Sequence, residues 1–577
     1  MTGESMGVLS RQSGSKASVG ALTILAVLST CLYGSISLLS WRFDFGSVAT
    51  DRPIIGVLCL FAVAFAAYLV AIRIAWRAPE SRPTLKLLIA TAIVFRVVML
   101  FSLPIQEVDI YRYLWDGTVS TAGVSPFRFS PEQVSSADLA TTGDASLERL
   151  VALRDHHPAL AEILRRVHFP DLPTIYPPTS QAVFAAASLT TPGEASLLTR
   201  LFIMKAWFIG FDIATLFVVI ALLRLCKKPA SLCVIYAWCP LLMKEVANSG
   251  HLDAVAVFVT TLAVYFVVRF LLWHRLPSCD EEKTANWKLA RLIYLGLIGV
   301  VLALAVGAKL YPVVLAPLFL FVIAKTCGWR IVLVPTTVFA VSTVVLLSSM
   351  FVGEKASPGK QLHSDPSRGV VTFLRRWEMN DYLFLLVIEN LKPTAGRGAH
   401  EIAWFTVVPE SGRQAVVNLV SSQFDIAAPE VPFFVARALT AALFIIVAMV
   451  IAWRTASDDI SRFCEGVFLT LAWFWLLCPT QNPWYWTWAL PLLPFARSRV
   501  WLAVSGLVLV YYLRFWLSYH FAESAVLGTP YTGAAFYDFV VTWIEFAPWF
   551  VLLTVGFVSR KQTSKWLDMP QYEGRTV

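Results

Sequence analysis

Long apolar runs alternate with short polar connections along most of this 577-residue chain. A run of about 20 apolar residues, wound as a helix, matches the hydrocarbon thickness of a bilayer. The pattern therefore predicts an all-α polytopic membrane protein of about 14 transmembrane helices, because a helix satisfies its own backbone hydrogen bonds in lipid. We expect spans near residues 19–40, 54–76, 85–104, 199–223, 230–247, 252–273, 291–308, 312–325, 331–351, 432–453, 463–479, 485–496, 500–519 and 539–558.

Two long polar connections interrupt this pattern and divide the chain. Loops of this length within a membrane domain are usually functional or disordered. The expected segments are 1–104 (a tail and three spans), 105–198 (a first long loop with short helices and an acidic motif), 199–351 (further spans), 352–431 (a second long loop) and 432–577 (the last spans and a tail).

Composition supports lipid as the solvent for most side chains. The chain is 57% hydrophobic and 15% charged, whereas soluble domains average about 45–50% and about 25%. The net charge of +9 comes from Lys and Arg in the short connections of one side, which predicts that this side and both termini are cytoplasmic. The two long loops are then extracytoplasmic. No soluble basic domain is present, which argues against nucleic acid as a partner.

The first long loop opens with a cluster of charged and aromatic residues. On a helix, Asp109, Arg112, Tyr113 and Asp116 would share one face at spacings i, i+3, i+4 and i+7, and Glu107 would lie in a neighbouring row. An interfacial amphipathic helix with internal ion pairs explains this spacing equally well. Carboxylates just outside a span can also act as a base beside a membrane-bound substrate.

Three further segments carry polar residues on the same predicted side. Tyr176 and Gln181 flank a proline pair. Two interpretations stay open: the prolines form a turn back into the membrane, or Tyr176 and Gln181 bind a polar ligand. His251 and Asp253 follow the fifth predicted span, and a capped turn is the alternative there. Lys309 lies between two apolar runs, which favours a functional role over a snorkelling lysine.

Two segments near the second half combine polar groups with aromatic rings. Arg375 and Arg376 precede Trp377, and Gln481 and Asn482 precede an aromatic cluster. Such amides and rings suit sugars, but they also suit the ordinary aromatic belt of a membrane protein. All of these constellations lie on the predicted outer side, so a single outer cavity is the economical explanation. The chain has no Gly-rich phosphate loop and none of the common zinc or serine-hydrolase motifs.

These segments together resemble a known family. The chain is similar to the polytopic GT-C glycosyltransferases that use polyprenyl-phosphate sugars, in the bacterial mannosyltransferase-type branch related to glycosyltransferase 87 and PIG-M-like enzymes. The resemblance rests, in chain order, on the run from Glu107 to Gly117, Gly123-Val124-Ser125-Pro126-Phe127, Tyr176-Pro177-Pro178, Gly250-His251-Leu252-Asp253, Lys309-Leu310-Tyr311-Pro312 and Asn482-Pro483-Trp484-Tyr485.

The resemblance implies a GT-C-like bundle that transfers a hexose, with mannose favoured, from a polyprenyl-phosphate donor to an extracytoplasmic acceptor with inversion. The acceptor would be a glycan, a glycolipid or a protein, and the location a bacterial cytoplasmic (inner) membrane. Family members differ in whether a divalent metal assists, and no residue is assigned to a metal.

The same resemblance assigns roles to residues. Asp109 is expected as the base, with Glu107 second. The motif here reads Glu-Val-Asp where the family has Asp-x-Asp, so the choice between the two carboxylates is open. Lys309, Arg375 and Arg376 are expected to bind the donor phosphate. The expected substrate-binding residues are Arg112, Tyr113, Asp116, Tyr176, Gln181, His251, Asp253, Gln481 and Asn482.

A lipid or lipid-linked-sugar transporter, or flippase, is the alternative. It accounts for the many spans and for Lys309. It predicts two halves with corresponding broken helices and a binding site near the bilayer midplane, whereas the polar groups here gather toward one side.

Overall fold

The computed structural model describes the chain except residues 1–2, 139–142, 275–284, 352–367, 456–458 and 559–577. Within the described part, eleven helices are long and apolar enough to cross a membrane, or twelve if one bent pair counts as a span. They are built from α1 (Gly3–Ser40), α2 (Ile54–Arg77), α3 (Arg82–Leu100), α9 (Leu197–Leu225), α12 (Asp253–His274), α13 (Ala285–Ala308), α15 (Leu333–Leu347), α19 (Val431–Thr455), α20 (Ile460–Leu477), the pair α22 and α23 (Trp501–Leu507 and Leu513–His520), and the pair α24 and α25 (Gly533–Phe536 and Thr542–Val558).

The all-α membrane fold expected from the sequence is confirmed, but three of the fourteen predicted spans are not straight membrane-length helices. The predicted span 230–247 is the bent pair, Ala230–Ala237 and Pro240–Asn248, with 47° between its halves. The second half begins with α11 (Pro240–Leu242), because proline has no amide hydrogen with which to continue the preceding helix. It ends in a π-helix, η4 (Met243–Asn248).

The other two predicted spans are shortened by proline. Residues 312–325 form a short apolar helix, Tyr311–Cys327, which opens with a 3-10 turn containing Pro312 and continues as α14 (Ala316–Cys327). Residues 485–496 fold as α21 (Pro483–Trp486) and a buried 3-10 turn, Leu490–Phe495, that contains Pro494. Apolar composition made both segments resemble spans, although their prolines prevent a long regular helix.

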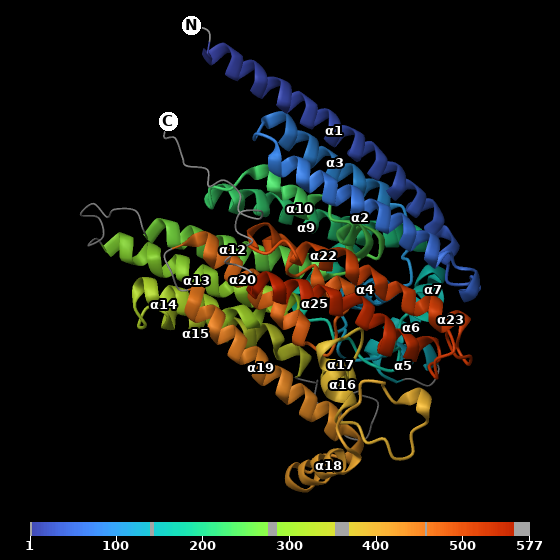
Figure 1. Ribbon diagram of the computed structural model, residues 1–577. Coiled ribbons are helices and arrows are strands. Elements are labelled where there is room, and N and C mark those ends of the chain that lie inside the picture. Colours follow the sequence, from blue (N-terminus) through green and yellow to red (C-terminus); the bar gives the residue numbers. More distant parts are fainter. Residues whose placement is uncertain (1–2, 139–142, 275–284, 352–367, 456–458, 559–577) are drawn as a thin grey trace.

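The two long polar connections fold into short helices that lie toward one end of the bundle, while α1 begins at the opposite end (Figure 1). The first connection forms α4 (Asp109–Thr121), α5 (Pro131–Ser136), α6 (Ala145–His156), α7 (Pro158–Arg165) and α8 (Pro178–Leu189). The second forms α16 (Arg368–Arg376), α17 (Leu383–Glu389) and α18 (Glu410–Phe424). Because α4 packs against α7, α8 and α9, it is held as part of the helical core.

A buried ion pair ties the first spans to the bent pair. The Arg96 guanidinium of α3 donates to the Asp212 carboxylate of α9, and both side chains are fully buried. Arg96 also donates to the carbonyl of Ala237, and the Tyr236 hydroxyl donates to Asp212. A charge in a membrane-spanning segment is costly unless it is paired in this way. The pair therefore fixes how α3, which leads into the acidic loop, is aligned against its neighbours.

Candidate functional site

The loop that leads from α3 into α4 is held by side chains from two other segments. The Lys205 ammonium of α9, fully buried, donates to the carbonyl oxygens of Met99, Leu100 and Ser102 at 3.1, 2.7 and 2.7 Å. Two of these carbonyls belong to the last turn of α3, where carbonyls lack helical partners. Lys205 thus fixes the end of α3, and with it the start of the acidic loop.

Asn248, at the end of the π-helix, fixes the rest of this loop. Its side-chain oxygen accepts from the amide of Ile105 at 3.0 Å, and its side-chain nitrogen donates to Ser102 Oγ and the Leu103 carbonyl at 2.8 and 2.7 Å. Gly250 then passes close to α4: a Cβ there would lie 2.5 Å from Ile110 Cδ1. Asn248 and Gly250, which directly precede the His251–Asp253 segment, therefore hold the acidic motif in position.

Asp109 begins α4 and is half-buried. The Tyr176 hydroxyl donates to Asp109 Oδ2 at 3.3 Å. Nearby, the Lys309 ammonium donates to both carboxylate oxygens of Asp253 at 2.7 and 2.8 Å and lies 4.2 Å from the centre of the Tyr485 ring. These five residues are called the Asp109 cluster below.

The charged members of the Asp109 cluster also interact electrostatically. Burial lowers the pKa of Lys309, and the negative charges of Asp253 and Asp109 oppose that effect. The indole of Trp488 also donates to Asp253 at 2.5 Å, and Trp488 stacks on Tyr311 with ring centres 4.1 Å apart. The cluster therefore combines two carboxylates, one ammonium and several aromatic faces.

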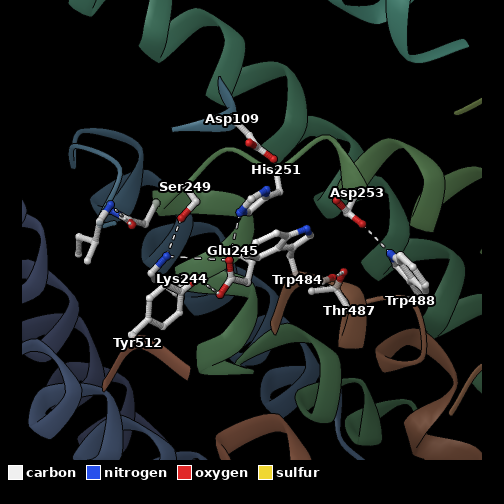
Figure 2. A network of polar contacts seen from close by, with 12 residues as sticks. Asp109, Lys244, Glu245, Ser249, His251, Asp253, Trp484, Thr487, Trp488 and Tyr512 are labelled. Carbon is white, nitrogen blue, oxygen red and sulfur yellow. Dashed lines mark hydrogen bonds and ion pairs between the residues drawn. The ribbon is translucent and has the colours of Figure 1, made fainter. Parts of the chain in front are cut away.

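A second cluster lies directly beside the first and is called the Glu107 cluster. It contains Glu107, Lys244, Glu245 and His251, whose side chains are 9% exposed or less. In Figure 2, the His251 ring lies between Asp109 and Glu245 in the view shown. The Tyr512 hydroxyl donates to Glu245 Oε1 at 2.8 Å.

The Glu107 cluster is only partly satisfied. His251 Nε2 lies 3.3 Å from Glu245 Oε2, but outside hydrogen-bond geometry, and neither ring nitrogen has a hydrogen-bond partner. The Lys244 ammonium donates to Ser249 Oγ at 2.6 Å and lies 3.9 Å from Glu245. Glu107 Oε1 has no partner. Burial raises the pKa of Glu107 well above its usual range, and Asp109 and Glu245 add to that rise while Lys244 opposes it.

Pairs of residues close together in the sequence contribute to both clusters. Glu107 and Asp109 separate into different clusters, and so do His251 and Asp253. Trp484 and Tyr485, which are consecutive in the sequence, form a third such pair. Trp484 stacks on His251 with ring centres 4.3 Å apart, while the Tyr485 ring faces the Lys309 ammonium. The two carboxylates of the acidic motif are therefore chemically different, because Asp109 is half-buried and held by a tyrosine whereas Glu107 is buried among charges.

The other predicted residues of α4 bind neighbouring protein groups. Arg112 Nη2 donates to the carbonyls of Phe169 and Leu172 at 2.9 and 3.0 Å. Gln181 Nε2 donates to Asp116 Oδ2 at 3.0 Å. Burial raises the pKa of Asp116, and Arg112 and Gln181 oppose that rise.

Aromatic packing completes this side of α4. The Tyr113 ring packs edge-on against Tyr176 at 4.9 Å and stacks on Phe184 at 4.8 Å. Together with the hydrogen bonds of Arg112 and Asp116, these contacts fix α4 against the remainder of the first loop.

Gln481 and Asn482 lie at the end of α20, where the second long loop crosses it. Met379 and Thr480 form an isolated parallel bridge there. Gln481 is fully buried and Asn482 is 3% exposed. Arg375 and Arg376 end α16, but their side chains lie outside the described part of the structure, so their predicted contact with phosphate is not located.

Unpartnered buried oxygen atoms gather around these two clusters and the bridge. Such atoms are rare in folded proteins, and each calls for an explanation. They are Glu107 Oε1, Gln181 Oε1, Glu245 Oε2, Asp381 Oδ2, Gln481 Oε1 and Asn482 Oδ1. A ligand rich in hydroxyl donors would satisfy this set. Among the described residues, no group of three or more His, Cys, Asp or Glu side chains could hold a metal ion.

Sequence reasoning missed Lys205, Lys244, Glu245 and the loop-holding role of Asn248. The signal was nevertheless present, because Lys205, Lys244 and Glu245 are ionisable residues inside predicted spans. Such residues mark functional or paired sites by default. The partners of Lys205 and Glu245 could not be assigned from the sequence, since Lys205 donates to backbone carbonyls and Glu245 accepts from the distant Tyr512.

The comparisons with known proteins give one match. A sequence model of the MptA_B family, described as alpha-(1->6)-mannopyranosyltransferase, N-terminal domain, matches residues 17–325. This range is more than half of the chain, and it contains Asp109, His251, Asp253 and Lys309. Neither the comparison with curated proteins nor that with solved structures gave a match. The chain therefore belongs to this family of α-mannopyranosyltransferases, and it is a multi-pass membrane glycosyltransferase.

Proposed function

We propose that this protein transfers mannose from a polyprenyl-phosphate donor to a hydroxyl of an extracytoplasmic acceptor, with inversion at the anomeric carbon. The family description names an α-(1→6) linkage, so inversion would require a β-linked donor. The acceptor would be a glycan or a glycan-bearing lipid or protein. The location would be a bacterial cytoplasmic membrane, with both termini inside and the short helices of the two long loops outside.

Asp109 is the proposed base. Its carboxylate would take the proton of the acceptor hydroxyl as that oxygen forms a bond to the mannose C1. The bond from C1 to the phosphate oxygen breaks, and its electron pair leaves with the polyprenyl phosphate. The half-buried position of Asp109 and its hydrogen bond from Tyr176 suit this role, because the base is oriented without being ion-paired. Glu107 is the second candidate, but burial raises its pKa and favours the neutral acid.

Lys309 is the proposed phosphate ligand. Its side chain is 17% exposed while that of Asp253 is 1% exposed, so the ammonium is the more accessible partner of the pair. An ammonium has three donors, and two of the contacts go to Asp253. The third can meet a phosphate oxygen and stabilise the charge that develops on the leaving group. The predicted contribution of Arg375 and Arg376 to phosphate binding remains part of this proposal.

The remaining predicted residues divide into two groups. Tyr176, His251, Gln481 and Asn482 are proposed to contact the sugar or the acceptor. Arg112, Tyr113, Asp116 and Gln181 are proposed to hold α4 in place, since their polar groups or rings are already engaged by the protein. Asp253 is proposed to orient Lys309. A divalent metal remains outside this scheme, because no step described here requires one.

The single observation that carries the proposal is that the half-buried carboxylate of Asp109, held by the Tyr176 hydroxyl, lies in one cluster with the Lys309–Asp253 ion pair. Base and phosphate ligand must lie on either side of one anomeric carbon for in-line displacement.

The test uses the purified full-length protein in lipid vesicles with two labelled donors, polyprenyl-phosphate mannose and a nucleotide-linked mannose. Transfer to a mannoside acceptor from the lipid donor alone is the expected result. Transfer from the nucleotide donor alone would contradict the donor assignment.

A further inference from the structure

A third polar site lies where the second long loop crosses the end of α20. The amide of Met379 donates to the Pro479 carbonyl at 3.0 Å, and the amide of Gln481 donates to the Met379 carbonyl at 2.9 Å. The Asn380 side chain donates to the Gln481 carbonyl at 3.1 Å. Two segments that are about a hundred residues apart in the sequence are therefore joined by hydrogen bonds where they cross.

This crossing presents hydrogen-bond acceptors that the protein leaves unused. Asp381 Oδ2, Gln481 Oε1 and Asn482 Oδ1 are buried and have no partner, and the three residues are 4%, 0% and 3% exposed. Leaving such groups unpaired costs about 1–3 kcal/mol each. Asn380, Asp381, Gln481 and Asn482 are called the Asp381 subsite below.

The backbone at the Asp381 subsite is also strained. Asn380 has a φ of 51°, a left-handed conformation that is uncommon for a residue with a side chain. Its side-chain oxygen accepts from the Tyr537 hydroxyl at 2.7 Å, which holds the strained turn in place. Tyr537 begins a π-helix, η12 (Tyr537–Val541), and short π-helices occur often at functional sites.

Two adjacent tyrosines connect this subsite to the Glu107 cluster. The Tyr512 hydroxyl donates to Glu245, whereas the Tyr511 hydroxyl lies 3.0 Å from Met379 Sδ. On the other side, Asn482 is followed within three residues by Trp484 and Tyr485, which contact His251 and Lys309. The Asp381 subsite is therefore next to the reacting centre and is separate from Asp109 and Lys309.

We propose that the Asp381 subsite binds hydroxyl groups of the acceptor glycan and so determines which acceptor is used. This inference rests on the proposed function and names the part of the site that meets the acceptor. Sugar hydroxyls are donors, and they match a set of three unused acceptor oxygens on two crossed segments.

The charge of Asp381 fits the same ligand. Burial and the neighbouring Glu378 raise the pKa of Asp381 well above its usual range. Hydrogen bonds from ligand hydroxyls to the carboxylate would offset that cost, because they favour the ionised form. A metal ion would also do so, but the described residues contain no three-ligand group for one.

The test compares wild-type protein with Asp381→Asn, using polyprenyl-phosphate mannose, a mannoside acceptor and its single-deoxy analogues. For Asp381→Asn we expect an acceptor KM raised about tenfold, as the loss of a hydrogen bond to a charged group predicts. The donor KM and the slow hydrolysis of the donor by water should change by less than about twofold on the same energy scale. One deoxy analogue that is poor for the wild type should be no poorer than its parent for the variant.

Glu389→Gln is the matched control. Glu389 is equally buried, but its carboxylate is already paired with Lys392 and Arg397 at 2.5 and 3.2 Å. Its loss should lower stability without changing acceptor KM. Thermal unfolding checks that each variant folds, and Asn482→Ala takes the place of Asp381→Asn if the latter does not.

Three outcomes would overturn the inference. An unchanged acceptor KM in Asp381→Asn would show that the Asp381 subsite does not bind the acceptor, and it would leave the proposed function intact. A deoxy penalty of the same size in wild type and variant would make Asp381 merely structural. Wild-type protein that neither transfers nor hydrolyses mannose from the lipid donor would overturn the proposed function itself, and this inference with it.

Discussion

The Lys309 ammonium lies 2.7 Å from one carboxylate oxygen of Asp253 and 2.8 Å from the other. Both groups lie beside the base candidate Asp109, and Asp253 is almost fully buried. Because burial disfavours the charged form of lysine, the positive charge of Lys309 depends on this partner. The pair therefore connects a residue at the start of α12 with the chemistry proposed for the donor phosphate.

Asp253→Asn should change the pH dependence of mannose transfer. Without the carboxylate, the pKa of Lys309 falls further, so the ammonium loses its proton at a lower pH than in the wild type. We expect transfer to decline at a lower pH in the variant than in the wild type, and in both below the unperturbed lysine pKa of about 10.4, because burial lowers the pKa of Lys309 and Asp253 opposes that effect. Breaking a buried pair should also cost about 3 kcal/mol of stability, measured by thermal unfolding.

Lys309→Arg is the control for this experiment, because arginine keeps its charge throughout the pH range in which the lysine loses its proton. Paired with Asp253→Asn, it should restore a flat pH profile. A double variant that still loses activity as the pH rises would show that another group titrates.

Gly250→Ala should displace α4. The φ of Gly250 is +67°, and a Cβ would lie 2.5 Å from Ile110 Cδ1 and 3.1 Å from Lys205 Cγ. We expect a loss of stability beyond the roughly 1–2 kcal/mol of backbone strain, together with a fall in kcat of about tenfold or more from misplacing the adjacent Asp109.

Gly528→Ala separates the two effects. Gly528 has a φ of +74°, and a Cβ added there would meet no other atom within 4 Å, so this variant should show the strain alone and keep its kcat. Equal kcat values for the two variants would contradict the coupling between Gly250 and the catalytic residues.

Asn248→Ala should loosen the hold on the loop that carries Glu107 and Asp109. It removes the hydrogen bonds to Ile105, Ser102 and Leu103, and the buried groups left behind should cost about 2 kcal/mol. We expect kcat to fall while the donor KM changes little, which transfer kinetics would measure.

The matched control is Asn390→Ala. Asn390 holds the second long loop through a similar set of bonds, to the carbonyls of Leu386 and Phe405 and the amides of Val407 and Val408. Its loss should reduce stability and spare kcat. Equal effects of both variants on kcat would argue that loop order in general matters, not the position of the acidic motif.

Glu107→Gln should stabilise the protein increasingly as the pH rises. The pKa of Glu107 is raised in the folded state by burial, so the unfolded chain loses its proton first and folding becomes less favourable with rising pH. This effect begins near the unfolded value of about 4.3 and ends at the raised folded value. Thermal unfolding of variant and wild type across pH should show the difference growing with pH; a constant difference would mean that folding does not raise the pKa of Glu107.

Hydropathy and charge patterning predicted most of the fold, because membrane spans depend on composition that can be read locally. Eleven predicted spans correspond to long helices of the described part. The errors fall at segments rich in proline, such as Leu490–Phe495, where apolar composition reflects burial against protein instead of lipid. The helix that begins at Asp109 was also predictable, since its polar spacing has a helical period.

The separation of Glu107 and Asp109 into two clusters could not be predicted from the sequence. Glu107 and Asp109 look equivalent in the sequence, but Lys244, Glu245 and Tyr512 surround only the first of them. Those neighbours come from segments more than a hundred residues away, and no local pattern links them. The pairing of Lys309 with Asp253 was also missed, although both residues had been assigned to the site, because no local pattern links positions that lie at the ends of separate helices.

The most direct test of the account is mannose transfer from polyprenyl-phosphate mannose by Asp109→Asn and Glu107→Gln, each compared with wild type after thermal unfolding has shown that it is folded. The account predicts that Asp109→Asn loses transfer by at least about a hundredfold, as the loss of a general base requires, while still binding the donor. Glu107→Gln should keep most of its activity. Full transfer by Asp109→Asn, with activity lost only in Glu107→Gln, would contradict the assignment of Asp109 as the base.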